Sequence, residues 1–150
     1  WKEIDRAINL LKNNNLILMQ CTSLYPCPPE KVGINIISEM KKRYKNIKSF
    51  GFSDHTEGFE AAILALQAGA TIFEKHITFS KKMYGSDARF AMEPKEFQNY
   101  VKSINKSKKI MKKKVDKNNI NNFKKMKEVF EKKIITKKKL KKLKILNKNN

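Results

Sequence analysis

Apolar residues over the first 111 positions recur with two alternating spacings, one typical of helices and one of buried strands. Residues 2–13 follow the helical period, and 16–21 is a short apolar run. A loop with three prolines, 22–29, separates this run from a second helix-like stretch at 32–45. A short, unbroken apolar run indicates a strand that is buried on both faces.

The same alternation continues along the chain. Strands are predicted at 47–53 and 71–76, and helices at 59–68 and 94–111. Gly69 follows the third helix, where a left-handed residue commonly ends a helix, and Pro94 suits the first turn of the fourth. Helical crossovers between buried strands predict an α/β fold with a parallel sheet of about three βα units. Its outer strands remain unpaired, as in an incomplete layer of a larger barrel.

The charge of the chain is concentrated at one end. The net charge is +20, but residues 1–100 hold 14 Lys and Arg against 11 Asp and Glu, whereas 101–150 hold 20 Lys against three acids. Nucleic-acid grooves tend to combine Arg with stacking aromatic rings. The tail has no Arg and only two Phe as aromatic residues. We therefore expect a basic, low-complexity tail and no nucleic-acid partner, although a nucleic-acid-binding arm stays open as an alternative.

The cysteine content and hydropathy favour a cytoplasmic protein. Cys21 and Cys27 are the only cysteines, and no apolar run approaches the roughly 20 residues that a transmembrane helix needs. Two free thiols suit a reducing compartment. We therefore expect no membrane association.

The two histidines of the chain, His55 and His76, fall at the ends of successive predicted strands. Functional residues of parallel α/β folds gather at these ends, so the two imidazoles could share one metal ion. Asp54 and Glu74 are carboxylates near them that could orient an imidazole. A site with two protein ligands leaves positions for water and substrate, as catalytic metals require. The alternative, that both are ordinary loop or core histidines, stays open.

Four motifs occur in a characteristic order. They are Ser23-Leu24-Tyr25-Pro26-Cys27-Pro28, Gly51-Phe52-Ser53-Asp54-His55-Thr56, Glu74-Lys75-His76-Ile77-Thr78, and Gly85-Ser86-Asp87 followed by Met92-Glu93-Pro94. In order and spacing they closely resemble the sialic acid synthase family, which makes N-acetylneuraminic, legionaminic and pseudaminic acids. The resemblance covers residues 1–111.

The resemblance implies a TIM (β/α)8 barrel enzyme that joins phosphoenolpyruvate to the aldehyde of an N-acylated hexosamine, such as N-acetylmannosamine, and releases phosphate. It implies a divalent ion, Mn²⁺ by expectation with Mg²⁺ or Co²⁺ as alternatives. His55 and His76 would be its two protein ligands. Together with Glu74, they are the expected catalytic residues.

The resemblance also assigns substrate contacts. Ser53 would touch phosphoenolpyruvate, and Ser23 stands where many members place an asparagine for the same substrate. Tyr25 and Asp87 would hold the amino sugar, with Glu74 beside the same pocket. Ser86 and Ala88 depart from the proline and histidine that other members carry around the aspartate, which leaves the choice of sugar open.

The chain is too short for a whole (β/α)8 barrel of roughly 250 residues. We therefore expect residues 1–111 to be the C-terminal part of the barrel. Residues 112–150 would be a Lys/Asn-rich linker, in which 128–146 resembles the truncated start of an antifreeze-like domain. The family forms homodimers and binds phosphate through earlier strands, so this piece alone is expected to be inactive. A truncated, inactive gene product is the other open interpretation.

Overall fold

The computed structural model describes residues 1–11, 15–133, 135–136 and 139. The chain divides into two compact units, 1–113 and 114–150.

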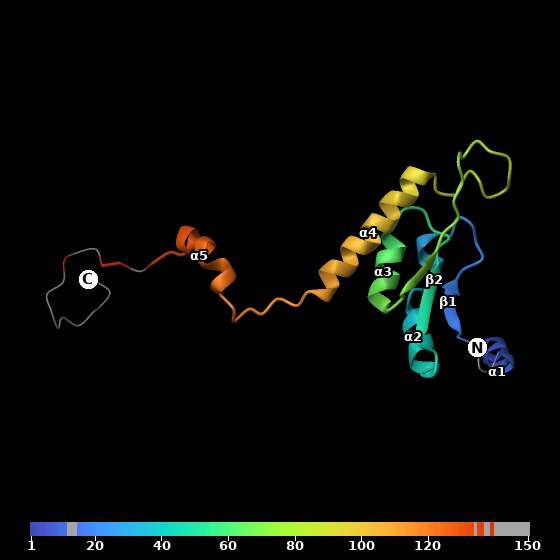
Figure 1. Ribbon diagram of the computed structural model, residues 1–150, viewed down its shortest axis with the longest axis horizontal. Coiled ribbons are helices and arrows are strands. Elements are labelled where there is room, and N and C mark those ends of the chain that lie inside the picture. The colour runs from blue at the N-terminus through green and yellow to red at the C-terminus, as the bar shows by residue number, and fades with distance from the viewer. Residues whose placement is uncertain (12–14, 134, 137–138, 140–150) are drawn as a thin grey trace. The chain divides into compact units, whose positions relative to one another are not determined.

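The first unit is built on a parallel three-stranded sheet with the strand order β1-β2-β3. The strands are β1 (Ile17–Cys21), β2 (Ser49–Ser53) and β3 (Ile72–Glu74). Cys21 pairs with Ser53, and Ser53 pairs with Glu74, so all three strands end at the same level. The predicted parallel sheet is therefore confirmed, and it brings three chain segments to one edge (Figure 1).

Four α-helices accompany the sheet: α1 (Lys2–Leu10), α2 (Asn35–Arg43), α3 (Glu60–Ala68) and α4 (Pro94–Lys112). Each lies within or close to a predicted helix. The second is shorter than predicted, because η1 (Pro29–Lys31) is a separate 3₁₀ turn and Gly33 follows it at φ 69°. A residue in this left-handed region cannot continue a right-handed helix. The helix therefore starts beyond it.

The termini of α3 and α4 follow from local sequence. Gly69 has φ 107° and donates its amide to the carbonyls of Ala65 and Leu66, which ends α3 as predicted. At the start of α4, Glu93 and Glu96 form a reciprocal capping box and Pro94 occupies the first turn. These caps fix the loops that enter and leave the sheet edge.

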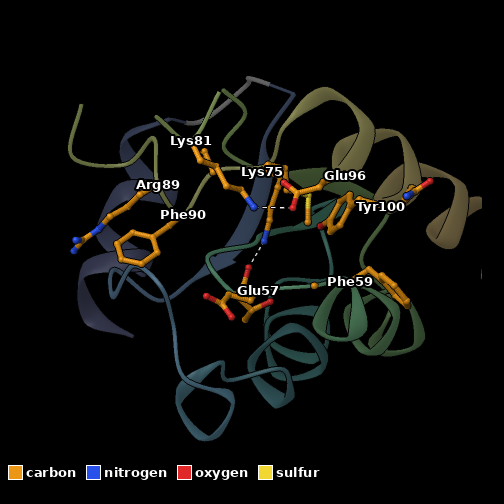
Figure 2. Close-up of a pocket in the computed structure, with 13 residues that line it drawn as sticks. Glu57, Phe59, Lys75, Lys81, Arg89, Phe90, Glu96 and Tyr100 are labelled. Carbon is orange, nitrogen blue, oxygen red and sulfur yellow. Dashed lines mark hydrogen bonds and ion pairs between the residues drawn. The ribbon is translucent and has the colours of Figure 1, made fainter. Parts of the chain in front are cut away.

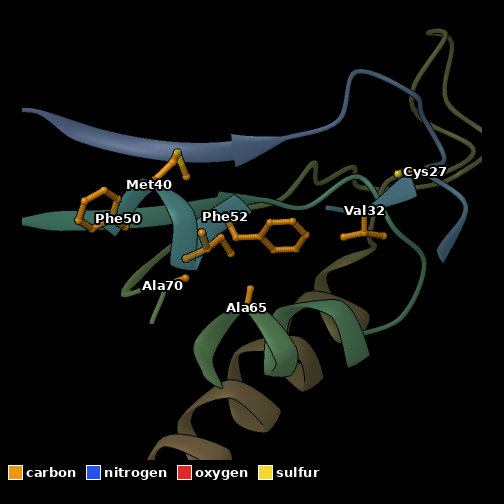
Figure 3. Packing of buried hydrophobic residues seen from close by; sticks show 8 residues of the cluster. Cys27, Val32, Met40, Phe50, Phe52, Ala65 and Ala70 are labelled. Carbon is orange, nitrogen blue, oxygen red and sulfur yellow. The ribbon is translucent and has the colours of Figure 1, made fainter. Parts of the chain in front are cut away.

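The core lies between the sheet and the helices. Phe50 and Phe52 on β2 point toward α2 and α3, where they pack with Ile37, Met40 and Ala65 (Figure 3). Side chains alternate along a strand, so Gly51 and Ser53 face the opposite side of the sheet. Glu74, which pairs with Ser53, faces that opposite side as well.

The first strand does not have the burial that its apolar run indicated. Its pattern predicted a strand buried on both faces, but Ile17 is half exposed and Cys21 is exposed. Within the described residues β1 pairs only with β2 and is therefore an edge strand. An apolar run indicates that a strand needs packing partners all around it. In the described sheet β1 has a neighbouring strand on one side only, so part of it stays exposed.

The second unit contains two short helical elements that the charge pattern did not predict. They are η2 (Asn121–Phe123) and α5 (Lys124–Phe130). All described residues from 114 onward are exposed. Much of the predicted segment 128–146 lies outside the described residues. No helix in the described part of the chain combines the length and the apolar character needed to cross a bilayer.

Candidate functional site

The two histidines lie together beyond the level ends of two neighbouring strands. His55 is two residues past β2, and His76 is two residues past β3. Their ring centroids are 5.2 Å apart with the planes at 77°. Because β2 and β3 are parallel neighbours of equal reach, the segments that carry the two histidines leave the same end of the sheet side by side.

The loop after β1 adds an aromatic ring to this pair. Its backbone is tied to the histidine segment by a 2.7 Å hydrogen bond from the Cys27 amide to the His55 carbonyl. The Tyr25 ring lies 5.2 Å from His55 and 4.6 Å from His76, measured between centroids. Tyr25 therefore contacts both imidazoles.

The loop between β3 and α4 supplies a carboxylate. Its base is closed by hydrogen bonds from the Met92 amide to the His76 carbonyl and from the Thr78 amide to the Met92 carbonyl. Within the loop, Asp87 Oδ2 lies 3.4 Å from His76 Nδ1. Asp87 can therefore orient the His76 ring and leave its Nε2 directed elsewhere.

Ser53 and Glu74 face the same side of the sheet as the histidines and contact each other. The Ser53 hydroxyl donates a 3.2 Å hydrogen bond to Glu74 Oε1. Cys21, at the end of β1, places its sulfur 3.9 Å from His55 Nε2. Ser23 lies in the exposed loop and makes no side-chain hydrogen bond to the described residues. The structure thus brings Tyr25, His55, His76 and Asp87 together, and it pairs Ser53 with Glu74 at the ends of the same two strands. Ser23 makes no polar contact with either group in the described part of the chain.

Two buried polar atoms at this site have no hydrogen-bond partner among the described residues. They are His55 Nδ1 and the Tyr25 hydroxyl oxygen. Burial, followed by the charges of Asp87 and Asp54, raises the pKa of Tyr25 above its usual value. Buried polar groups normally have partners, so these two atoms suit a ligand that enters the site.

Asp54 takes a different role from the one expected. Its fully buried carboxylate accepts hydrogen bonds at Oδ1 from the amide and hydroxyl of Thr56, at 2.8 and 2.7 Å, and at Oδ2 from the Tyr100 hydroxyl, at 2.9 Å. Lys75 Nζ lies 3.4 Å from Oδ1. Asp54 therefore belongs to a buried network on the outer side of the strand ends, formed by Asp54, Thr56, Lys75 and Tyr100, which the sequence analysis missed.

Charges inside this network shift the titration of its members. Burial lowers the pKa of Lys75, and the attraction of Asp54 opposes that effect. Burial also raises the pKa of Tyr100, with the Asp54 charge acting in the same direction. A pocket of about 420 Å³ opens beside the network, lined in part by Lys75, Glu96 and Tyr100 (Figure 2). This pocket is separate from the histidine pair.

Comparison with known proteins identifies the family. The NeuB family matches residues 1–117 of the 150. The chain belongs to the NeuB family.

Relatives in the NeuB family include two named synthases. The chain is 32% identical to the N,N'-diacetyllegionaminic acid synthase of Campylobacter jejuni, over 99% of the chain and 45% of that protein. It is 37% identical to human N-acetylneuraminate-9-phosphate synthase, over 69% of the chain and 28% of that protein.

A solved structure has a similar fold. The N-acetylneuraminic acid synthetase of Leptospira borgpetersenii superposes with a TM-score of 0.71 and 29% identity, over 88% of this chain and 47% of that one. The chain thus spans less than half the length of these relatives. All the residues that converge at the sheet edge lie inside the NeuB match.

Proposed function

We propose that this NeuB-family chain forms the C-terminal part of a (β/α)8 barrel in a nonulosonic acid synthase. The enzyme would condense phosphoenolpyruvate with an N-acylated amino sugar such as N-acetylmannosamine and release phosphate. The observation that carries the proposal is the convergence of His55, His76, Tyr25 and Asp87 at one sheet edge. The similarity to the legionaminic acid synthase and the N-acetylneuraminate-9-phosphate synthase supports the same reaction class.

The residues present fit a divalent ion. With metal–nitrogen bonds of about 2 Å, two imidazoles that share an ion have ring centroids roughly 5 Å apart, close to the 5.2 Å between His55 and His76. The unpartnered, buried His55 Nδ1 and the Asp87 carboxylate at His76 Nδ1 also suit such a role. Among the described residues no three His, Cys, Asp or Glu side chains already form a metal-binding group. Water and substrate would supply the remaining ligands.

A bound Mn²⁺, or Mg²⁺ or Co²⁺ in its place, would supply Lewis acidity toward the sugar aldehyde. The reaction forms a bond between C3 of phosphoenolpyruvate and the aldehyde carbon, adds one water at C2, and breaks the bond from C2 to the phosphate oxygen. The Tyr25 hydroxyl, which has no partner among the described residues, would donate a hydrogen bond to the sugar. Asp87 would accept one from a sugar hydroxyl or amide.

Ser53 and Glu74 would act on the phosphoenolpyruvate side of the site. Their mutual hydrogen bond holds the Ser53 hydroxyl at the sheet edge. From there it would reach the substrate carboxylate, while Glu74 would lie beside the pocket of the amino sugar. Ser23, which is exposed in the neighbouring loop, would turn toward phosphoenolpyruvate only when the substrate is bound.

The same proposal covers the organisation of the protein. It includes a cytoplasmic homodimer and a Lys-rich linker that leads into an antifreeze-like domain. The alignment with the Campylobacter jejuni synthase supports the linker assignment, because it extends over 99% of the chain and therefore includes the basic tail.

Replacement of either histidine by alanine in the full-length protein tests the function. His55→Ala and His76→Ala should each reduce phosphate release from phosphoenolpyruvate to background. Both side chains lie past the strand ends and outside the core, so the far-ultraviolet circular dichroism should not change. Lys48→Ala, an exposed residue just before β2, is the control and should keep full turnover. Near-normal turnover in either histidine variant would refute the proposal.

A further inference from the structure

The sheet by itself does not fix the separation of His55 and His76. The paired register of β2 and β3 ends at Ser53 and Glu74, and one further backbone hydrogen bond runs from the Asp54 amide to the Glu74 carbonyl at 2.9 Å. Beyond that point the His55 carbonyl accepts from the loop after β1, and the His76 carbonyl accepts from Met92. In the described chain, each histidine backbone is therefore bonded to a different loop.

Side chains on the other face of the sheet connect these two segments. Asp54 lies between Ser53 and His55, and Lys75 lies between Glu74 and His76, so alternation turns both away from the imidazoles. The Lys75 ammonium is 3.4 Å from Asp54 Oδ1 and also donates to the Thr56 carbonyl. The two side chains are 0% and 1% exposed. This Asp54–Lys75 bridge is thus a direct link between the residues that flank the two histidines.

The bridge is itself held in place by α4. The Tyr100 hydroxyl bonds Asp54 Oδ2, and its ring centroid lies 5.6 Å from the Lys75 ammonium. Figure 2 shows the Lys75 and Tyr100 side chains next to each other at the end of the strands. Both carboxylate oxygens of Asp54 have partners, which is the condition under which a buried charge is tolerated.

A buried ion pair is not a strong source of stability. Removing two charges from water is expensive, and well-packed apolar residues often give equal or greater stability in the same place. What a fully bonded pair does provide is a fixed geometry between the segments that it joins. Here those segments carry the two proposed metal ligands, one residue away on each side.

We infer that the Asp54–Lys75 bridge, with Tyr100, is a positioning device that sets the separation and orientation of His55 and His76 for a shared metal ion. The inference rests on the proposed function for the ion, but the bridge itself touches neither ion nor substrate. Asp54, Lys75 and Tyr100 are therefore positioning residues.

Manganese binding by the full-length protein, followed by electron paramagnetic resonance, tests this role. Asp54→Asn should weaken Mn²⁺ binding about 10- to 100-fold, as loss of a group that orients ligands does elsewhere. Tyr100→Phe removes one hydrogen bond and should weaken binding about two- to tenfold. The matched control is Asp5→Asn, because Asp5 also binds a cation and a tyrosine, Arg43 and Tyr44, but on the surface between α1 and α2. Its Mn²⁺ affinity should equal that of the parent.

A double substitution separates positioning from stability. Lys75→Met alone leaves the buried carboxylate unpaired and should lower the melting temperature, whereas Asp54→Asn combined with Lys75→Met should recover part of it. Affinity for Mn²⁺ should stay low in the double variant. If affinity recovers together with the melting temperature, the bridge is merely structural and the inference is wrong.

Two further results are decisive, one against the inference and one against the proposed function. One is Mn²⁺ affinity within about twofold of the parent in folded Asp54→Asn or, should that variant not fold, in Tyr100→Phe. The other applies if the parent binds no Mn²⁺ or His55→Ala binds it normally, which would refute the proposed function instead. In that case crystal structures of the parent and Tyr100→Phe decide, because an unchanged centroid separation of 5.2 Å would exclude positioning, and an altered one would support it.

Discussion

Replacement of Gly51 by alanine should push apart the two strands that carry the histidines. Gly51 lies in the middle of β2 and pairs with Met19 on one side and Ile72 on the other. An added Cβ would stand 2.9 Å from the Ile72 carbonyl oxygen and 2.9 Å from Met19 Cγ, where ordinary contact begins at 3.4 Å. The methionine side chain can rotate away, but the carbonyl belongs to the backbone of β3.

The size of the destabilisation follows from the position of that carbonyl in the backbone of β3, because it cannot rotate away as a side chain can. The shortfall requires β3 to move by about half an ångström, and overpacking of this kind typically costs 1–3 kcal/mol. Alanine also lowers the conformational entropy of the unfolded chain, which offsets about 0.4–1 kcal/mol of this cost. We therefore expect Gly51→Ala to lower the free energy of unfolding by about 1–2 kcal/mol.

Urea unfolding of the full-length protein measures this change. The midpoint should fall while the slope stays constant, because the native fold is retained. A double-mutant cycle that combines Gly51→Ala with Met19→Ala identifies which neighbour of the added methyl group causes the strain. If the effect of Gly51→Ala disappears in the Met19→Ala background, the side chain and not the Ile72 carbonyl is responsible, and the argument fails. A variant as stable as the parent would refute it outright.

Two further predictions concern the core and the start of α4. Phe52→Ala should lower the free energy of unfolding by about 3–5 kcal/mol, because Phe52 is fully buried. Phe79→Ala, at a side chain that is 87% exposed, should change it little in the same urea assay. The Lys81 ammonium, followed by the Glu93 amide, lowers the pKa of Glu96 below its usual 4.5. The contribution of ionised Glu96 to folding stability is therefore complete above pH 4.5. It is lost as the pH falls through the lowered pKa of the folded protein. The melting-temperature difference between parent and Glu96→Gln should therefore shrink on acidification, and a constant difference would contradict this.

Much of the first unit could be predicted from the sequence, because its elements carry local signals. Gly69 and the residues around Pro94 end and begin helices through their own conformational preferences. Burial could not be predicted in the same way. Ile17 belongs to a run that reads as fully buried, but its exposure depends on which strands lie beside it. That information is not local.

The candidate site likewise has one part that local sequence signals predict and another part that depends on non-local contacts. The placement of His55 and His76 follows from two parallel strands of equal reach, which the alternating pattern predicts. The partner of Asp54 could not be predicted from adjacency in sequence, which suggested His55. Strand alternation was the available signal, since a residue between two inward-facing neighbours must face outward. It still would not have named Tyr100, which comes from a helix 46 positions away.

The helix in the basic tail was missed for a different reason. Residues 124–130 hold three lysines among a few apolar side chains, and the charge density dominated the interpretation. Lysine is nevertheless a good helix former. Composition of this kind therefore does not exclude a short, exposed helix such as α5.

The closed base of the loop between β3 and α4 has a consequence for protein engineering. Hydrogen bonds at Thr78 and Met92 hold the two ends of the loop together, and the capping box of α4 lies directly after them. Residues 82–90 are the part of the loop that can be exchanged as a cassette, because Lys81 bonds Glu93 and Glu96 and is thereby tied to the start of α4. Under the proposed function, grafting this stretch from relatives such as the legionaminic acid and N-acetylneuraminate-9-phosphate synthases would test whether it sets the choice of amino sugar.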